Sequence, residues 1–513
     1  MSERGSPDGA AAAAGAPGSP GELRYASGPG RWVLVATVLG SAMAAIDATV
    51  VGIALPAIGR DFHAGLATLQ WVLTAYTLTL AGLLLLSGAL GDRYGRKRVF
   101  LAGVAWFALA SIICGVAPDA PILIAARAVQ GIGAALLTPG SLAILEASFR
   151  RADRSRAIGA WSGFSGVGTA IGPFLGGWLI AAMSWRLIFI INLPIAVLVL
   201  AVTWRHVPES RDPEQTGRLD VGGGVLVTLG LVGLTYGLIE GPAAGWAKPG
   251  SVSALAAGAA ALAVFIVSQG RVAAPLLPLH LFSSAQFSAA NVVTFVVYGA
   301  LGGVLFLLPI QLEQVSGYTA LEAGISLLPV TVIMLALSAR SGALAARIGP
   351  RLQMSVGPVL IGAGLFLFAR IGYSGNYLTE VLPAVLVFGL GLATNVAPLT
   401  STVLAAAPAR HAGIASAVNN DVARAAGLLA VAILPAAAGL TATSYLHPAQ
   451  FSAGFRNASF ISAGLCILAG ALAAVTIGNP GRARPQAAEA AAQFHCGLDG
   501  PASSPVPADS PPG

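Results

Sequence analysis

Long apolar runs alternate with short polar segments from Arg31 to Asn479. Each run has about 18 to 25 mostly apolar residues, enough to cross a hydrocarbon core of roughly 30 Å as an α-helix. The strict alternation of apolar and polar positions that is typical of a membrane β-barrel does not occur. We therefore predict an all-α membrane protein with about 14 transmembrane helices. The runs lie near residues 32–57, 69–90, 99–117, 121–147, 158–181, 187–204, 220–240, 250–268, 288–310, 321–340, 353–371, 379–404, 412–440 and 457–478.

Composition supports this prediction. Hydrophobic residues fill 56% of the 513 positions and charged residues only 10%, whereas a soluble domain has about 25% charged residues. Residues 1–30 lack the apolar core of a signal peptide, and residues 480–513 are rich in Pro, Ala and Ser, so we expect both segments to be disordered cytoplasmic tails. Because the cysteines and histidines show no metal-ligand spacing, we expect no metal site and no cofactor.

The positive charges fall mostly in every second loop, which predicts the orientation. Lys and Arg accumulate in cytoplasmic loops, which places the N-terminus on the cytoplasmic side. With an even number of spans the C-terminus is cytoplasmic as well. We expect the protein to lie in the plasma membrane. The net charge of +7 then reflects orientation, and no nucleic-acid partner is expected. The cytoplasmic set is Arg93, Arg96, Lys97, Arg98, Arg150, Arg151, Arg154, Arg156, Arg205, Arg211, Arg218, Arg271, Arg340, Arg347, Arg351, Arg410, Arg482 and Arg484. The outer loops carry Arg60, Arg186, Lys248, Arg370 and Arg456.

The energy source is constrained by the two lysines of the chain. A phosphate-binding P-loop requires Gly-Lys-Ser/Thr, but Lys97 and Lys248 follow Arg96 and Ala247. We therefore expect no ATP site of that kind, and any uphill work must draw on an ion gradient or a partner subunit. No nucleophile, base and oxyanion-stabilising set occurs at membrane depth, so we do not expect an enzyme.

An internal repeat relates the two halves of the chain. The segment "GALGDRYGRKR" (Gly88 to Arg98) leaves the second run, and "GALAARIGPR" (Gly342 to Arg351) leaves the tenth. Both have Gly-Ala-Leu, then Arg, then Gly at the same spacing. Two hairpins of one design indicate two homologous halves, which favours alternating access to a site between them.

Several motifs together resemble those of the major facilitator superfamily, in particular its fourteen-span drug:proton antiporter group. "GALGDRYGRKR" is similar to the signature loop Gly-x-Leu-x-Asp-Arg-x-Gly-Arg-Lys, and "RAVQGIGAA" contains the Arg-x-x-Gln-Gly pattern. "GVGTAIGPFLGGWL" resembles the antiporter signature, and "IDATVVGIALP" resembles a pattern typical of the fourteen-span group. "WRLIFIINLP", "PLLPLHLF" and "GYTALEAGISLLP" also match in order.

The resemblance implies two six-helix bundles with two extra helices inserted between them. Its expected divisions are a tail at 1–30, a bundle at 31–205, a linker and the inserted helices at 206–270, a bundle at 271–479 and a tail at 480–513. Two positions depart from the family pattern. Gly52 replaces the usual Asn, which bears on the substrate or ion path, and Ala346 replaces the aspartate of the second hairpin.

A carboxylate and a guanidinium are expected at similar depth in the first and fourth runs. Asp47 lies roughly 24 Å along a helix from Arg31, and Arg127 lies just below the outer end of its run near Pro121. In the resembled fold both helices line the central cavity. Our hypothesis is that Asp47 couples protons or binds cations and that Arg127 tunes it. The alternative is a purely structural ion pair between two helices.

Two glycine-containing motifs are expected to control conformation. The hairpin residues are interpreted as a gate, with Asp92 capping a neighbouring helix, although positive charge alone also orients helices. The antiporter residues are interpreted as a kinked, closely packed surface that lets the helix bundle rock or seals it against proton leak. The alternative is ordinary packing of small residues between helices. The gate set is Gly88, Asp92, Arg93, Gly95, Arg96 and Lys97, and the antiporter set is Gly168, Gly172, Pro173, Gly176 and Gly177.

The remaining candidates are polar positions of cavity-lining runs. Asp421 and Arg424 lie on one face of the thirteenth run, where they either neutralise each other or take part in coupling. The candidate substrate contacts are Gln70, Trp71, Tyr76, Gln130 and Asn395, with helix–helix hydrogen bonding as the alternative role.

The function predicted from these features is proton-driven export of hydrophobic drugs or antibiotics, cationic ones included, by alternating access. The expected partners are a small hydrophobic substrate, protons and the lipid bilayer, and the sequence leaves open whether an envelope adaptor protein joins them. The alternatives are export of an endogenous metabolite or lipid-like molecule and, in another class, a receptor that does not transport. A receptor generally needs an output domain, and both tails look too short for one.

Overall fold

The computed structural model describes residues 23–211, 219–246, 249–408, 412–441 and 444–479. The described chain is helical, and its only β pairing is an isolated bridge between Leu23 and Phe149. Within these described residues, thirteen helical segments are long and apolar enough to cross a membrane. The remaining long helix, α5, carries its charged residues in its first two turns and has none from Ala157 to Ala182. The prediction of an all-α membrane protein with about 14 spans is confirmed.

The helices follow one another through short connections. The first half and the inserted pair comprise α1 (Gly28–Asp61), α2 (Leu66–Tyr94), α3 (Arg96–Gly115), α4 (Ala120–Ser148), α5 (Arg151–Ala182), α6 (Leu187–Ile190), α7 (Asn192–His206), α8 (Val221–Ala244) and α9 (Pro249–Gln269). The second half comprises η1 (Leu279–Ser283), α10 (Ala285–Ile310), η2 (Gln311–Val315), α11 (Ala320–Ser326), α12 (Leu328–Ile348), α13 (Pro350–Phe368), η3 (Tyr377–Val381), α14 (Leu382–Ala405), α15 (Ala412–Ala437), η5 (Ser444–Leu446) and α16 (Pro448–Thr476). Two runs expected as single helices are interrupted, at Ile191 and at Leu327.

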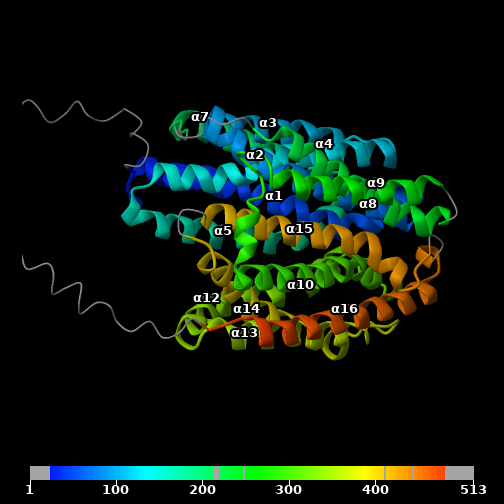
Figure 1. Ribbon diagram of the computed structural model, residues 1–513. Helices are drawn as coiled ribbons and strands as arrows, with labels where there is room; N and C mark the ends of the chain where they lie inside the picture. The colour runs from blue at the N-terminus through cyan, green and yellow to red at the C-terminus, as the bar shows by residue number, and fades with distance from the viewer. Residues whose placement is uncertain (1–22, 212–218, 247–248, 409–411, 442–443, 480–513) are drawn as a thin grey trace, which may run out of the picture.

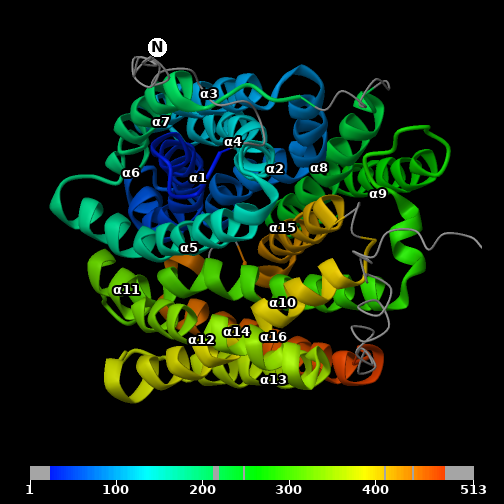
Figure 2. The ribbon, with the colours of Figure 1, turned by 90° about the vertical axis from the view of Figure 1, so that its left-hand side faces the viewer.

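The long helices run side by side in two groups (Figure 1). Helices α1 to α7 pack together on one side, and α10 to α16 pack together on the other (Figure 2). The inserted helix α8 packs on α9 and touches both groups, through α2 of the first and α15 of the second. Leu78, Leu231 and Leu428 share a small apolar cluster at this junction. The inserted pair therefore closes one side of the seam between the groups.

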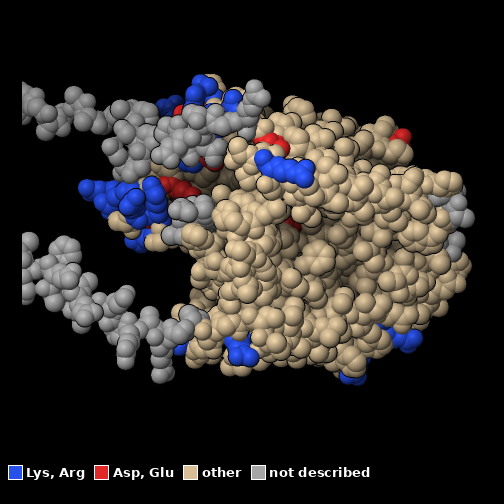
Figure 3. Space-filling view, in the orientation of Figure 1, with Lys and Arg blue, Asp and Glu red and all other residues tan. Residues whose placement is uncertain are grey.

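The two groups meet at one end of the molecule and part at the other. We call the end where α1 begins and where most Lys and Arg gather the basic end (Figure 3). At the opposite end, a Cβ on Gly177 of α5 would lie 2.5 Å from the carbonyl oxygen of Ala320 in α11. Gly159, about five turns nearer the basic end on the same face of α5, has nothing within 4 Å of its Cβ position. The molecule is correspondingly hollowed at its basic end (Figure 3).

The repeated hairpins have the same construction in both halves. Gly95 alone joins α2 to α3, and Gly349 alone joins α12 to α13, each with a positive φ (112° and 89°) that glycine adopts readily. Shortly after the last helix of each half, a side chain returns to cap the third helix. Glu209 Oε1 accepts from the Lys97 N–H (3.1 Å), and Asn479 Oδ1 accepts from the Arg351 N–H (3.1 Å).

Glycine packing between α3 and α4 generates a stability prediction. A Cβ on Gly133 would lie 2.6 Å from the backbone nitrogen of Phe107, so Gly133→Ala forces the helices apart and destabilises the protein by about 1–3 kcal/mol. Gly163 has nothing within 4 Å, so Gly163→Ala serves as the matched control and stabilises its helix by up to about 1 kcal/mol. Thermal unfolding of the purified variants in detergent measures both changes. Equal unfolding temperatures for the two variants would contradict this packing.

Candidate functional site

Asp47 and Arg127 form a fully buried ion pair between α1 and α4. Arg127 Nη1 lies 2.6 Å from Asp47 Oδ2, and neither side chain is exposed to solvent. Asp47 occupies the buried side of α1, between Met43 and Val50. The expectation that these residues lie at similar depth is confirmed by this contact.

Two amide side chains complete the coordination of the carboxylate, and a serine accepts from both amides. Gln130 Nε2 donates to Asp47 Oδ1 (2.8 Å) and is also within 2.8 Å of Ser111 Oγ. Asn192 Nδ2, from the start of α7, donates to the same carboxylate oxygen (3.1 Å). Gln130 Oε1 in turn accepts from Arg127 Nη1 (2.6 Å). Asp47 is thus held by α4 and α7 together, with α3 beside them.

Aromatic rings and a backbone carbonyl hold the guanidinium. Arg127 lies over the Tyr76 ring of α2, 4.3 Å from its centroid, and 5.7 Å from the Phe189 centroid. Its Nε donates to the Val72 carbonyl (3.3 Å), while Nη2 has no hydrogen-bond partner among the described residues. Cation–π attraction strengthens when the cation is desolvated, as it is here. The structure therefore brings together four predicted site residues: Asp47, Arg127, Gln130 and Tyr76.

The second half supplies polar residues that are not joined to this network. Asn395 of α14 is fully buried, packs against Gly357 of α13, and neither of its amide atoms has a hydrogen-bond partner in the described chain. Its role as a substrate contact stays a prediction. Asp421 and Arg424 of α15 make no ion pair with each other, and Asp421 Oδ1 and Arg424 Nε have no hydrogen-bond partner among the described residues. Whether they neutralise each other or take part in coupling stays a prediction, because a three-residue spacing permits contact without enforcing it.

The predicted gate residues lie at the basic end. Asp92 pairs with Arg96 (2.8 Å) instead of capping a helix, so that part of the interpretation is wrong. Glu209 provides the cap on α3, because it reaches the first turn of that helix from beyond α7. Lys97 Nζ donates to the Trp204 carbonyl (2.8 Å), and Arg93 lies over the Tyr94 ring. A Cβ built on Gly88 would lie 3.8 Å from the side chain of Pro139 in α4.

The antiporter residues make α5 a closely packed surface on two sides. Gly168, Gly172 and Gly176 face Ala42, Thr49 and Val50 of α1. Gly177 and Pro173 face α11, where Ala320 and Gly324 approach them. One helix face therefore packs within its own group and another packs on the opposite group, as small residues permit.

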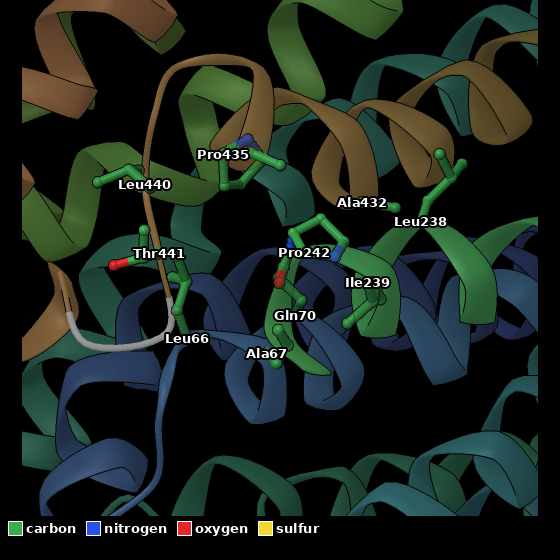
Figure 4. Close-up of a pocket in the computed structure, with 12 residues that line it drawn as sticks. Leu66, Ala67, Gln70, Leu238, Ile239, Pro242, Ala432, Pro435, Leu440 and Thr441 are labelled. Atoms are coloured by element: carbon green, nitrogen blue, oxygen red, sulfur yellow. The ribbon is translucent and has the colours of Figure 1, made fainter. Parts of the chain in front are cut away.

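A small cavity lies where α2, α8 and α15 meet (Figure 4). Its volume is about 20 Å³, room for roughly one water molecule, and Gln70 lies on its wall. Gln70 Nε2 donates to the Val431 carbonyl (2.6 Å), which joins the two groups of helices. Trp71 Nε1 donates to Glu240 of the inserted helix (3.0 Å). These two candidate substrate contacts are engaged in helix–helix hydrogen bonds in this structure.

A second inter-group contact lies at the end opposite the basic end. Arg60, near the end of α1, lies 3.6 Å from Glu313 of η2. The Glu313 side chain is 3% exposed, whereas that of Arg60 is 58% exposed. Gln314, the neighbour of Glu313, donates to Tyr445 Oη (3.2 Å). Charged and polar contacts thus add to the glycine packing that closes this end.

Residues 37–432 match the family model of the Major Facilitator Superfamily, and the chain belongs to this family of membrane transporters. Its members are not enzymes, and the chain is a multi-pass membrane protein. Among similar proteins is the multidrug resistance protein Stp of Mycobacterium tuberculosis, 36% identical over 81% of this chain and 77% of that protein. The tetracenomycin C resistance and export protein of Streptomyces glaucescens is 35% identical over 78% and 74%. The methylenomycin A resistance protein of Bacillus subtilis is 35% identical over 82% and 90%.

Solved transporter structures share the fold. A bacterial homologue of the human lysosomal transporter Spinster, in an inward-facing and unoccupied conformation, superposes with a TM-score of 0.64 at 17% identity, covering 88% of this chain and 98% of that one. A D-xylose-proton symporter superposes with a TM-score of 0.61 at 16% identity, covering 88% and 98%. At these identities the likeness establishes the fold alone.

Sequence reasoning missed three residues of these sites. Asn192 stands in a quoted motif, "WRLIFIINLP", and an Asn in an apolar run signals a buried hydrogen bond. Ser111 gave no signal, because a lone serine in an apolar helix usually bonds its own backbone. Glu209 stood in a segment expected to be a linker, so its return to α3 was not visible in the sequence.

The buried ion pair generates the second prediction. Arg127→Gln leaves the Asp47 carboxylate buried without its cation, and it should lower the free energy of unfolding by about 3–5 kcal/mol. Adding Asp47→Asn removes the unpaired charge and should restore part of that loss. Thermal unfolding in detergent measures both variants, with Arg150→Gln at the exposed pair to Asp153 as the control. A double variant no more stable than Arg127→Gln would refute this account.

Proposed function

We propose that the protein is a proton-driven exporter of hydrophobic compounds, antibiotics and other drugs among them, and that it works by alternating access. The names of the relatives support the substrate class: they are multidrug, tetracenomycin C and methylenomycin A resistance proteins. The fold of the solved transporters supports the transport role.

The buried Asp47–Arg127 pair is the observation that carries the proton coupling. Protonation of Asp47 would leave the Arg127 charge buried without an anion, which is costly at this depth. The guanidinium would then have to move or find another partner, and its cage of Tyr76, Val72 and Phe189 would have to rearrange with it. A proton on one carboxylate is in this way linked to the positions of several helices.

The shape of the molecule supports a cytoplasm-facing state. The arrangement of Lys and Arg favours the cytoplasmic side for the basic end, with both termini there and the protein in the cell membrane. The two groups of helices part at that end and meet at the other. We propose that residues 31–205 and 271–479 rock against each other, and that 206–270 carries the inserted helices. In the opposite state, the face of α5 at Gly159 and Gly163 would close on the second half.

The proposed gate and antiporter residues act in this rocking motion. The hairpin from Gly88 to Lys97 is tied to the last turn of α7 through the Trp204 carbonyl and to the segment after α7 through Glu209. Movement of α7 would therefore be transmitted to the start of α3. The α5 glycines allow close packing without a side chain to displace.

Proton coupling is tested by Asp47→Asn. This variant keeps the size of the side chain but loses the ionisable group, so export that depends on the proton gradient should fall to the background level at normal expression. Asp119→Asn is the matched control, because Asp119 caps α4 at an exposed position and Asn caps equally well. Accumulation of fluorescent dyes and antibiotics is measured in cells with and without an uncoupler. Uncoupler-sensitive export retained by Asp47→Asn would refute the role of this residue.

A further inference from the structure

The end opposite the basic end is closed by apolar contacts between the two groups of helices. Ile58 of α1, Leu312 of η2 and Leu440, which follows α15, belong to one apolar cluster that extends across both groups. A Cβ built on Gly59 of α1 would collide with the Tyr445 hydroxyl of η5, so these two residues are in contact across the seam. Side chains from both groups therefore exclude water from this end.

Glu313 of η2 is a carboxylate enclosed by these contacts. Its side chain is 3% exposed, and its Oε1 has no hydrogen-bond partner among the described residues. Its Oε2 lies 3.6 Å from Arg60 Nη2, whereas a charge-assisted hydrogen bond measures about 2.7–2.9 Å. Because the Arg60 side chain is 58% exposed, water weakens its attraction for the carboxylate. A buried carboxylate with one distant partner is costly, and binding of a proton removes that cost.

Few other charges surround Glu313. Helices α10, α11 and α16 pack on η2, and α10 has no charged residue. Glu322 of α11 bonds the start of its own helix, and Arg456 of α16 is exposed. Tyr445 of η5 is the other titratable group, and its hydroxyl accepts from the residue that follows Glu313. Arg60 is therefore the one cation of the described residues that pairs with Glu313.

The residue that follows Arg60 does not compete for it. Asp61 pairs with Arg186 of the first group (2.7 Å) and also accepts from Trp185 Nε1 (3.0 Å). The carboxylate that Arg60 meets is the one on the opposite group. Arg60 and Glu313 thus form a charge contact that exists only while this end is closed.

We propose that Glu313 is a proton-binding residue in addition to Asp47, one that takes up a proton when the outer end closes and releases it when the outer end opens. In the open state the carboxylate meets water and is ionised, whereas closure favours the neutral acid. The proton comes from the outer solution and returns to it, so Glu313 makes closure depend on the outer pH and carries no proton across the membrane. The inference rests on the alternating access and the orientation proposed above.

The sign of the pH dependence follows from proton uptake. Because closing binds a proton, acidic solution favours the closed outer end. One proton changes the ratio of closed to open molecules by up to about tenfold per pH unit. Closing of the outer end is the step that returns an exporter to its cytoplasm-facing state, so an acidic exterior should favour that step.

The test measures a distance across the outer end in purified full-length protein. Met183→Cys and Leu378→Cys, at exposed positions of the first and second groups at this end, each carry a spin label. Cys496→Ser leaves only the buried Cys114 and Cys466 besides the labelled sites. Double electron–electron resonance is recorded from about pH 5 to about pH 9. In the wild type the shorter distance should predominate at acidic pH and a longer one should gain at alkaline pH.

Glu313→Gln places a neutral amide of the same size in the closed end. It should keep the outer end closed at every pH, with the distances that the wild type has at acidic pH. Glu322→Gln is the matched control and should keep the wild-type pH response, because Glu322 is an exposed carboxylate and Gln also fits its capping box. Repeating both variants with Asp47→Asn removes the other proposed proton site, so the result does not depend on the coupling of export.

Arg60→Gln is a second variant, and it is expected to fold because Arg60 is mostly exposed. It removes the cation that stabilises only the ionised carboxylate. Its outer end should therefore be as closed as in the wild type at about pH 5 and more open at about pH 9.

A pH response retained by Glu313→Gln would overturn the proposal, as would an equal loss in Glu322→Gln. A longer distance that the wild type populates equally at every pH would overturn the role of Glu313 alone. Absence of the longer distance under all conditions would overturn alternating access and the proposal with it. Loss of the role of Asp47 in export would leave these distances unchanged, so the two proposals fail separately.

Discussion

Burial of one ion pair constrains the whole first half of the molecule. A carboxylate and a guanidinium without solvent are tolerated only when each has several partners. Asp47 and Arg127 find those partners on α2, α4 and α7, so the contacts of these two side chains fix the positions of these helices relative to α1. The glycines that bring α5 onto α1 complete the enclosure. A transporter can use such a pair because a change in its charge is felt by every helix that touches it.

The two halves share a backbone design but not a charge design. The hairpins at Gly95 and Gly349 are alike, and both third helices receive a cap from beyond the last helix. The polar network around Asp47, however, lies entirely in the first half, while Asn395 of the second half is buried without a hydrogen-bond partner among the described residues. The two halves of the duplicated fold thus share their packing, but the buried ion pair of Asp47 and Arg127 lies in the first half. The inserted helix α8 adds a contact to both halves on one side of the seam.

Hydrophobic periodicity was sufficient to predict the fold class, because lipid forces every spanning backbone to satisfy its own hydrogen bonds. Counting residues along helices was sufficient to place Asp47 level with Arg127, since the rise per residue is fixed. Side-chain partners between distant helices were not predictable in this way. Asn192 donates to Asp47, and Ser111 accepts from Gln130, only because α7 and α3 lie beside α4. Asp421 and Arg424 form no ion pair within 4 Å despite a favourable spacing. Spacing fixes which face a residue occupies, but neighbouring helices decide what it touches.

The paired caps have a consequence for how the halves respond to ionic strength. Glu209 is a carboxylate at the positive end of a helix dipole, and its second oxygen lies 3.7 Å from Arg98. Its hold on the first hairpin is therefore electrostatic and weakens as salt screens it. Asn479 holds the second hairpin through a neutral amide, which salt affects little. Two loops of the same shape are thus held by different interactions, one charged and one neutral. Only the contact that holds the first loop should weaken as the ionic strength of the solution rises.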